Sequence, residues 1–178
     1  CVDANGFANG NQGFQDEGKY IAGPGKPPVE ITPQDADIIW VYDMINELGV
    51  FPHNASNCSV LVVGDIVYAC TSNGQDWSHS NIPSPLSPSF IAHNKKTGEL
   101  LGEDDAGIGP KIFHGQWSSP SMGLVNGKPQ IQPGIRSADP GRPPESGSWP
   151  DPTISWTRRR RPSSAMRLAF AALSCEVR

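Results

Sequence analysis

The sequence predicts an all-β fold built from repeated four-stranded antiparallel units, and three observations support this prediction. Residues 59–70 contain two runs rich in β-branched residues, Val60–Val63 and Ile66–Cys70, separated by Gly64-Asp65. A Gly-Asp loop between such runs is typical of a hairpin, because glycine adopts the positive φ that a type II′ turn requires. The same order of strand and turn residues occurs again on both sides of this hairpin.

The hairpin begins a unit of four predicted strands. Both of its arms are apolar at successive positions, which indicates strands that are covered on both faces. After an insertion over residues 73–88, Ser89–Ala92 and Glu99–Leu101 are the third and fourth predicted strands, joined by the polar turn Asn94–Gly98. Four antiparallel strands with covered inner members are what the blades of a β-propeller require.

Landmarks of this unit recur at a nearly constant interval. The turn glycines Gly64 and Gly127 are 127 − 64 = 63 residues apart, and Trp40 and Gly102 are 102 − 40 = 62 residues apart. Residues 1–6 and 37–40 match the third and fourth strands, and residues 119–127 match the hairpin. The period exceeds the roughly 40–50 residues of an ordinary blade, so each unit must carry insertions.

Residues 1–131 are therefore predicted to form a partial β-propeller of about two four-stranded blades. At this period the chain of 178 residues holds fewer than three units, which cannot close a ring. We expect a fragment, with the remaining blades supplied by further sequence or by protein partners. Cys1 in place of an initiator methionine favours the same interpretation. A short helical connector is predicted over Asp43–Leu48, with Asp43 as its N-cap and Gly49 as its stop.

Two stretches resemble a known repeat. Residues 62–68 (VVGDIVY) and 91–102 (IAHNKKTGELLG) are similar to the PQQ-like repeat, the pyrroloquinoline-quinone-type or quinoprotein-like β-propeller motif, whose usual pattern is Ala-x-Asp-x-x-Thr-Gly-x-x-x-Trp. The resemblance covers about residues 1–131. It implies a disc of about eight blades in which the Trp of each blade packs on the next. Trp40 occupies that position, His93 stands in place of the Asp, and Gly102 stands in place of the second Trp.

The resemblance also implies which residues pack the blades and where the protein resides. The residues expected to support blade packing are Trp40, Gly64, Gly98 and Gly127. Residues 51–54, 81–85 and 113–120 are similar to a bacterial subgroup of this family that is found outside the cytoplasm. A periplasmic or extracellular location is therefore expected.

Histidine and aromatic residues at the start of each unit are candidates for ligand binding. Phe51-Pro52-His53-Asn54 has its counterpart in Phe113-His114-Gly115-Gln116-Trp117, and matching positions of stacked blades face the disc surface or axis, where propellers bind ligands. The insertion over residues 73–88 adds the indole of Trp77, which could stack on a quinone or a sugar. Alternatively, the histidines bond to backbone groups and lock the blades, and the indole anchors its own loop. The candidate ligand-binding residues are His53, Asn54, Trp77, His79, His114 and Trp117.

The cysteines do not have the spacing of metal ligands, and no metal site is predicted from the sequence. With a two-residue hairpin loop, Cys58 faces Thr71 and Cys70 faces Ser59, on opposite sides of the sheet, which excludes a disulfide between them. A three-residue loop would instead place Cys58 directly across from Cys70. The first register is favoured, with two buried thiols.

Two functional classes follow from the resemblance. A complete ring of the quinoprotein class would bind PQQ and calcium and oxidise an alcohol or a sugar, with a carboxylate as general base. No residue of this chain can be assigned that role, and the chain alone is expected to be inactive. The alternative is a non-catalytic propeller scaffold for protein–protein interaction, similar to outer-membrane assembly lipoproteins. A shared fold does not decide between them.

The composition of the chain limits the classes of partner that it is expected to bind. The net charge of −4 and the isoelectric point near 5.5 do not suggest a nucleic-acid partner, and no apolar run is long enough to span a membrane. Residues 132–178 are rich in Pro, Arg and Ser and include Arg158–Arg161. They lack the alternation of strands, so a disordered or out-of-frame tail is predicted, with a basic nucleic-acid-binding arm as the alternative.

Overall fold

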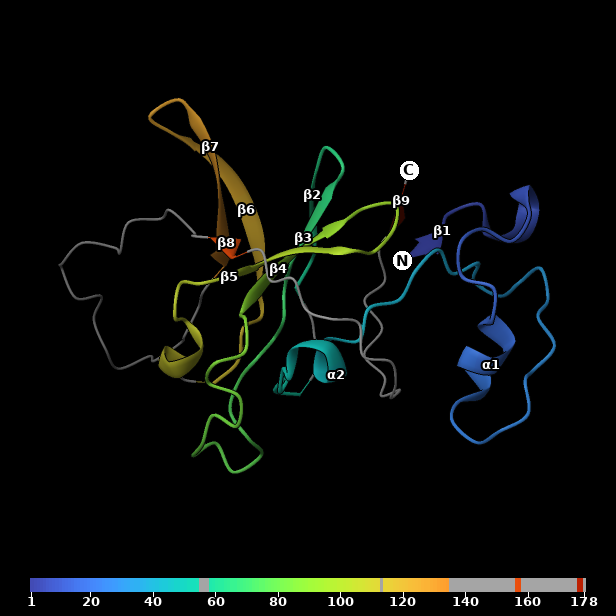
Figure 1. Ribbon diagram of the computed structural model, residues 1–178, viewed down its shortest axis with the longest axis horizontal. Coiled ribbons are helices and arrows are strands. Elements are labelled where there is room, and N and C mark those ends of the chain that lie inside the picture. Colours follow the sequence, from blue (N-terminus) through green and yellow to red (C-terminus); the bar gives the residue numbers. More distant parts are fainter. Residues whose placement is uncertain (55–57, 113, 135–155, 158–175, 178) are drawn as a thin grey trace.

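The computed structural model describes residues 1–54, 58–112, 114–134, 156–157 and 176–177 (Figure 1). The helical elements are η1 (Gly6–Asn9), α1 (Glu17–Ala22), α2 (Met44–Leu48) and η2 (Gly109–Lys111). The strands are β1 (Val2–Asp3), β2 (Leu61–Val63), β3 (Ile66–Cys70), β4 (Phe90–Asn94), β5 (Leu100–Asp104), β6 (Ser118–Val125), β7 (Lys128–Gly134), β8 (Trp156–Thr157) and β9 (Glu176–Val177).

The central sheet has the order β2-β3-β4-β5, all antiparallel, with β8 added beside β5. The predicted hairpin and its register are confirmed, because Val63 pairs with Ile66 and Leu61 pairs with Tyr68. The loop is therefore Gly64-Asp65. Gly64 has a φ of 60°, as a type II′ turn requires.

The second predicted hairpin is also present, as β6 and β7. Val125 pairs with Lys128, and the loop residues Asn126 and Gly127 have φ values of 52° and 74°. Two successive positive φ values define a type I′ turn, for which Asn-Gly is the preferred sequence. In Figure 1 this hairpin projects beside the central sheet.

Strand β3 is buried on both faces, as the apolar run Ile66–Cys70 predicted, and its neighbour β4 is buried in the same way. The other arm of the hairpin, β2, was also expected to be covered on both faces, but it is the edge strand of the sheet and Val62 is 44% exposed. Val67 and Ala69 lie on one face, and the neighbouring residues Cys70 and Phe90 lie on the other, each with 2% exposure or less. Helix α2 packs against the first face, where Met44, Leu48, Val50, Ala69 and Ile91 form the main hydrophobic cluster. Burial of this kind contributes roughly 1.5–3 kcal/mol for each large side chain.

Helix α2 begins and ends where the sequence predicted. The carboxylate of Asp43 accepts hydrogen bonds from the backbone N–H groups of Ile45 and Asn46, both at 3.0 Å, which satisfies two donors of the first turn. Gly49 ends the helix in the left-handed conformation, with a φ of 66°. The short helix thus fixes the path of the chain into the sheet.

The N-terminal residues form a short antiparallel pairing with residues 37–40. Val2 forms a β-bridge with Ile38. The N–H of Asp3 donates to the carbonyl of Asp37 at 2.8 Å, and the N–H of Ile39 donates to the carbonyl of Cys1 at 2.9 Å. These segments were predicted to be the third and fourth strands of a preceding unit. Their antiparallel pairing is consistent with neighbouring third and fourth strands.

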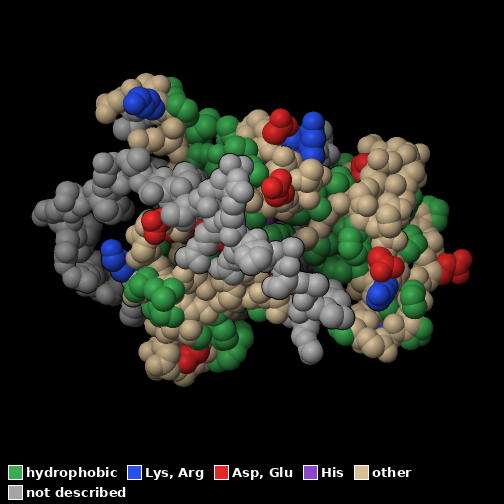
Figure 2. Space-filling model, viewed as in Figure 1, with side chains coloured by type: hydrophobic (Ala, Val, Ile, Leu, Met, Phe, Trp, Pro, Cys, Tyr) green, Lys and Arg blue, Asp and Glu red, His purple; other side chains and the backbone are tan. Residues whose placement is uncertain are grey.

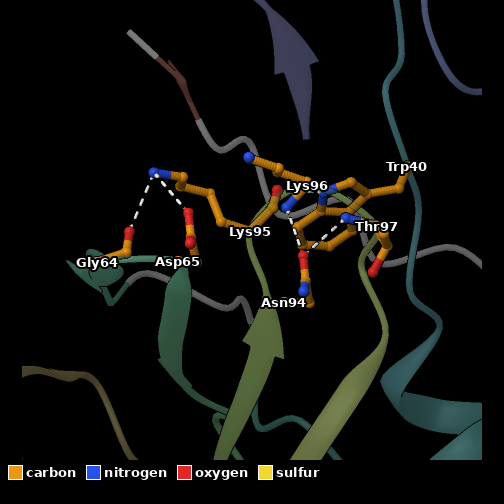
Figure 3. Close-up of polar contacts among 7 residues, drawn as sticks. All are labelled: Trp40, Gly64, Asp65, Asn94, Lys95, Lys96 and Thr97. Atoms are coloured by element: carbon orange, nitrogen blue, oxygen red, sulfur yellow. Dashed lines mark hydrogen bonds and ion pairs between the residues drawn. The ribbon is translucent and has the colours of Figure 1, made fainter.

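Trp40 follows this pairing and lies against the turn that joins β4 to β5 (Figure 3). Its indole N–H donates to the carbonyl of Lys95 at 2.9 Å. The ring covers Gly98, where an added Cβ would lie 2.6 Å from Cδ2 of the indole. His93 stacks on the same indole, with ring centroids 5.8 Å apart. Trp40 therefore joins the N-terminal segment to the central sheet.

The side chain of Asn94 caps the turn between β4 and β5. The side-chain oxygen of Asn94 accepts from the backbone N–H groups of Lys96 at 2.9 Å and Thr97 at 3.1 Å (Figure 3). His93 points into the core and its Nδ1 bonds to the carbonyl of Gly98 at 2.9 Å. Counting the pattern Ala-x-Asp-x-x-Thr-Gly from Ala92 to Gly98 also places its Asp at Asn94, one residue after His93.

No disulfide joins the two hairpin cysteines, as the two-residue register predicted. The Cys58 thiol donates to the carbonyl of Cys70 at 3.4 Å, and the Cys70 thiol donates to the carbonyl of Ser118 at 3.3 Å. Cys70 is buried, but Cys58 is only partly so. A hydrogen bond with the Cys70 side chain, opposed by burial, lowers the pKa of Cys58 to about 7.

Residues 7–36, a stretch rich in Gly, Asn and Pro, contain helix α1. Strand β5 extends through Asp104, and Glu103 is 5% exposed. Strand β7 extends to Gly134, beyond the expected boundary at residue 131. Strands β8 and β9 pair with β5 and β1; residues 135–155, 158–175 and 178 lie outside the described residues.

The fold is thus rich in strands, with one four-stranded antiparallel sheet extended by β8 and a separate two-stranded hairpin. Short helices and extended segments connect and cover them. Among the described residues, no helix has the length and apolar character needed to cross a bilayer.

The buried His93 makes the fold sensitive to acid. Burial lowers the pKa of His93 below the usual 6.5, and the bond to Gly98 opposes this shift. Below pH 6.5 the unfolded chain binds a proton that the folded chain excludes, so stability is complete above that pH and is lost as the pH falls toward the lower folded value. We expect His93→Asn to reduce this loss in urea unfolding between pH 7.5 and 5. If the free energy of unfolding falls equally with pH in the wild type and in His93→Asn, the prediction is contradicted.

Candidate functional site

The site forms where three segments distant in sequence meet. Asn73–Gln75, in the connection between β3 and β4, lies between residues 51–53 on one side and residues 114–115 on the other. On the first side Pro52 bridges Asn73, and the N–H of His53 donates to the carbonyl of Ser72 at 3.1 Å. On the second side Gly74 bridges Gly115, and the N–H of Gln75 donates to the carbonyl of His114 at 2.8 Å.

Gly74 permits this close approach. An added Cβ at this position would lie 2.7 Å from Cβ of His53 and within contact distance of the His114 carbonyl oxygen. No side chain fits between backbones at that separation. The central segment must therefore carry glycine where the two histidines cross it.

Three histidines converge at this junction. The ring nitrogens of His53, His79 and His114 that could bind an ion lie within 4.8 Å of one another. His53 Nε2 and His114 Nε2 are 2.8 Å apart, although the two residues are 61 positions apart in sequence. The centroid of the His79 ring lies 4.8 Å from each of the other two centroids. His53 is buried, His114 is half-buried and His79 is exposed.

The hydrogen bonds of His53 fix its tautomer. Its Nδ1 lies 2.8 Å from the carbonyl oxygen of Gln75, which can only accept, so Nδ1 carries the proton. The neutral ring then has a free lone pair on Nε2, which faces Nε2 of His114. His114 supplies the proton of that contact. The pair is thus a neutral donor and acceptor.

A compact turn places His79. The carboxylate of Asp76 accepts from the hydroxyl of Ser78 at 2.6 Å and from the side-chain amide of Asn81 at 2.9 Å. The bond from Ser78 is the main cause of a strongly lowered pKa of Asp76. The N–H of His79 donates to the carbonyl of Asp76 at 3.0 Å, and His79 takes a φ of 56°, which is uncommon for a residue other than glycine.

Two indoles flank the histidines. The Trp117 ring lies 4.8 Å from that of His114, and the Trp77 ring lies 5.8 Å from that of His53, centroid to centroid. Trp77 is 66% exposed and contacts Phe51 at its edge. The indole N–H of Trp117 is buried and has no hydrogen-bond partner among the described residues. The site therefore has an apolar wall and one open side.

The surroundings of His114 disfavour its charged form. Desolvation, followed by the proximity of His53 and His79, lowers the pKa of His114. A proton added to this ring would face the other two rings at short range.

Five of the six candidate ligand-binding residues meet at this site. They are His53, Trp77, His79, His114 and Trp117. Asn54 is exposed, with a φ of 61°, at the surface end of the same segment. The interpretation of His53 as a residue that bonds to the backbone also holds, because its Nδ1 binds Gln75. Sequence analysis missed Gly74 and Asp76, which had no recognisable motif, and it predicted no metal site.

The donor set does not fit calcium. Calcium takes about six to eight oxygen ligands, whereas this cluster offers three imidazole nitrogens. The carboxylate of Asp76 is already engaged within its own turn. No step through PQQ or calcium is derived from these residues.

Comparisons of the chain with models of protein families, with curated proteins and with solved structures found no match.

Proposed function

We propose that the chain is a β-propeller module of a bacterial protein outside the cytoplasm, with a ligand site at the junction between successive blades. The observation that carries the proposal is the packing of Trp40 on Gly98. The indole joins the end of one predicted unit to the β4–β5 turn of the next. This is the blade-to-blade contact that the PQQ-like repeat implies.

Exposed apolar side chains support the need for further blades or a protein partner. Val62 on β2 and Leu124 on β6 are 44% and 74% exposed, and Met122 is 50% exposed. Figure 2 shows hydrophobic side chains gathered over the region of these strands. In a propeller, a neighbouring sheet covers such positions. A structure of this chain within its complete assembly tests the proposal, and a sheet not arranged with others around a central axis contradicts it.

The two functional classes of such a module differ in cofactor use. A quinoprotein-like oxidoreductase would take up PQQ with calcium once its ring is complete, whereas a scaffold would not. The lack of fit between the histidine cluster and calcium favours the scaffold class for the residues described.

A cofactor assay tests this choice. We expect the complete assembly that contains this chain, mixed with PQQ and calcium, to show neither cofactor uptake by absorbance nor reduction of a dye in the presence of alcohols and sugars. The physical reason is that its site offers nitrogen donors to an ion that requires oxygen. A known PQQ enzyme serves as the positive control. Measurable turnover would contradict the prediction and restore the oxidoreductase class.

A further inference from the structure

We propose that His53, His79 and His114 bind one divalent ion of the late first transition row, such as Zn²⁺. The inference goes beyond the propeller proposal and does not depend on PQQ. It rests on the convergence of three ligand nitrogens within 4.8 Å, contributed by three separate segments. Neutral imidazole is the side chain that zinc, copper and nickel ions favour, and three histidines with an open fourth position are a known zinc arrangement.

The orientation of His53 supports this assignment. Metal-binding histidines almost always donate their second ring N–H to a carbonyl or carboxylate group, which fixes the tautomer and directs the free nitrogen at the ion. His53 has this arrangement, with Nδ1 on the carbonyl of Gln75 at 2.8 Å and Nε2 directed at His114. Because His53 is fully buried, its ring has one fixed position.

The His53–His114 contact is close to the geometry of two ligands on one ion. Their Nε2 atoms are 2.8 Å apart. Two nitrogens on a tetrahedral zinc ion with bonds of about 2.0–2.1 Å are about 3.3 Å apart. An opening of about half an ångström, available to the half-buried His114, is therefore sufficient. The ion takes the place of the hydrogen between the two nitrogens, and neutral His114 changes tautomer, so that its proton moves from Nε2 to Nδ1.

The exposed His79 completes the set from the solvent side. The Asp76 turn holds it in the left-handed conformation that directs its ring toward the other two. Non-glycine residues in this conformation cluster at functional sites, where the surrounding bonds hold them. Trp77 and Trp117 surround the rings with low-polarity surface, which strengthens the bonds between the ion and its ligands.

Calorimetric titration of the untagged chain with Zn²⁺ tests the proposal. We expect one Zn²⁺ per chain, reversal by a chelator, and no heat from Ca²⁺. His79→Gln is the primary variant, because His79 is exposed and its loss does not disturb the core. Since loss of an outer-shell partner alone costs about 10–100-fold in affinity, we expect His79→Gln and His114→Gln each to weaken binding by at least about 100-fold.

The fourth histidine provides the matched control. His93 lies outside the cluster, in the core near Trp40, so His93→Asn should leave zinc affinity within about threefold. Co²⁺ adds a second readout, because its visible absorption reports nitrogen ligands in a tetrahedral site. Unchanged affinity in folded His79→Gln and His114→Gln, or no binding to the folded wild type, would overturn the proposal. Neither result bears on the propeller assignment.

Discussion

Gly98→Ala is expected to lower the free energy of unfolding by about 2–5 kcal/mol. Two physical effects add at this position. Its φ of 72° is strained for alanine, by about 1–2 kcal/mol. The new methyl group would also lie 2.6 Å from the indole of Trp40, and overpacking of this kind costs about 1–3 kcal/mol. Urea unfolding followed by tryptophan fluorescence measures the total.

Gly64→Ala separates the two effects. Gly64 has a φ of 60°, and an added Cβ there has no heavy atom within 4 Å. The decrease in the free energy of unfolding of Gly64→Ala should therefore equal the conformational strain alone, about 1–2 kcal/mol. The difference between the two variants gives the contribution of the Trp40 contact. Equal losses would show that the indole does not rest on Gly98, and the blade-packing proposal would lose its main support.

Gly74→Ala is expected to separate the segments that carry the histidines. The added methyl group would meet the backbone of His114 and the Cβ of His53, neither of which can turn aside as a flexible side chain would. We expect a loss of about 1–3 kcal/mol in the free energy of unfolding, together with a zinc affinity at least about 10-fold weaker. Urea unfolding and calorimetric titration measure the two effects.

Gly123→Ala is the matched control for this variant. Gly123 lies in β6, has no positive φ and has open space around an added Cβ. A change within about 0.5 kcal/mol and unaltered zinc binding are expected there. If Gly74→Ala behaves like Gly123→Ala, the three segments are not held as closely as described.

Local chemistry in the sequence predicted the sheet, the turns and the connecting helix well. The Gly64-Asp65 loop determined the hairpin register, and Asp43 with Gly49 determined the limits of α2. These features depend on residues adjacent in the chain. Helix α1 was missed because its few residues lie within a stretch dominated by glycine, asparagine and proline.

The candidate site was predicted only in part. Repetition of His after Phe in successive units drew attention to His53 and His114, and the length of the insertion drew attention to Trp77 and His79. Their convergence could not be predicted, because it depends on backbone bonds across Gly74 between segments more than 20 residues apart. A spacing of 61 residues matches no short ligand motif.

The positions of His53 and His114 in the predicted units also determine how the site could arise by duplication of a unit. His53 precedes the central sheet and His114 precedes the β6–β7 hairpin, so each predicted unit brings one of the two facing rings. Under the proposed repeat, duplication of a single unit would supply both facing histidines at once, whereas the insertion with His79 would have to be added separately. A tandem array could therefore gain such a centre at each new boundary, and an isolated unit could not.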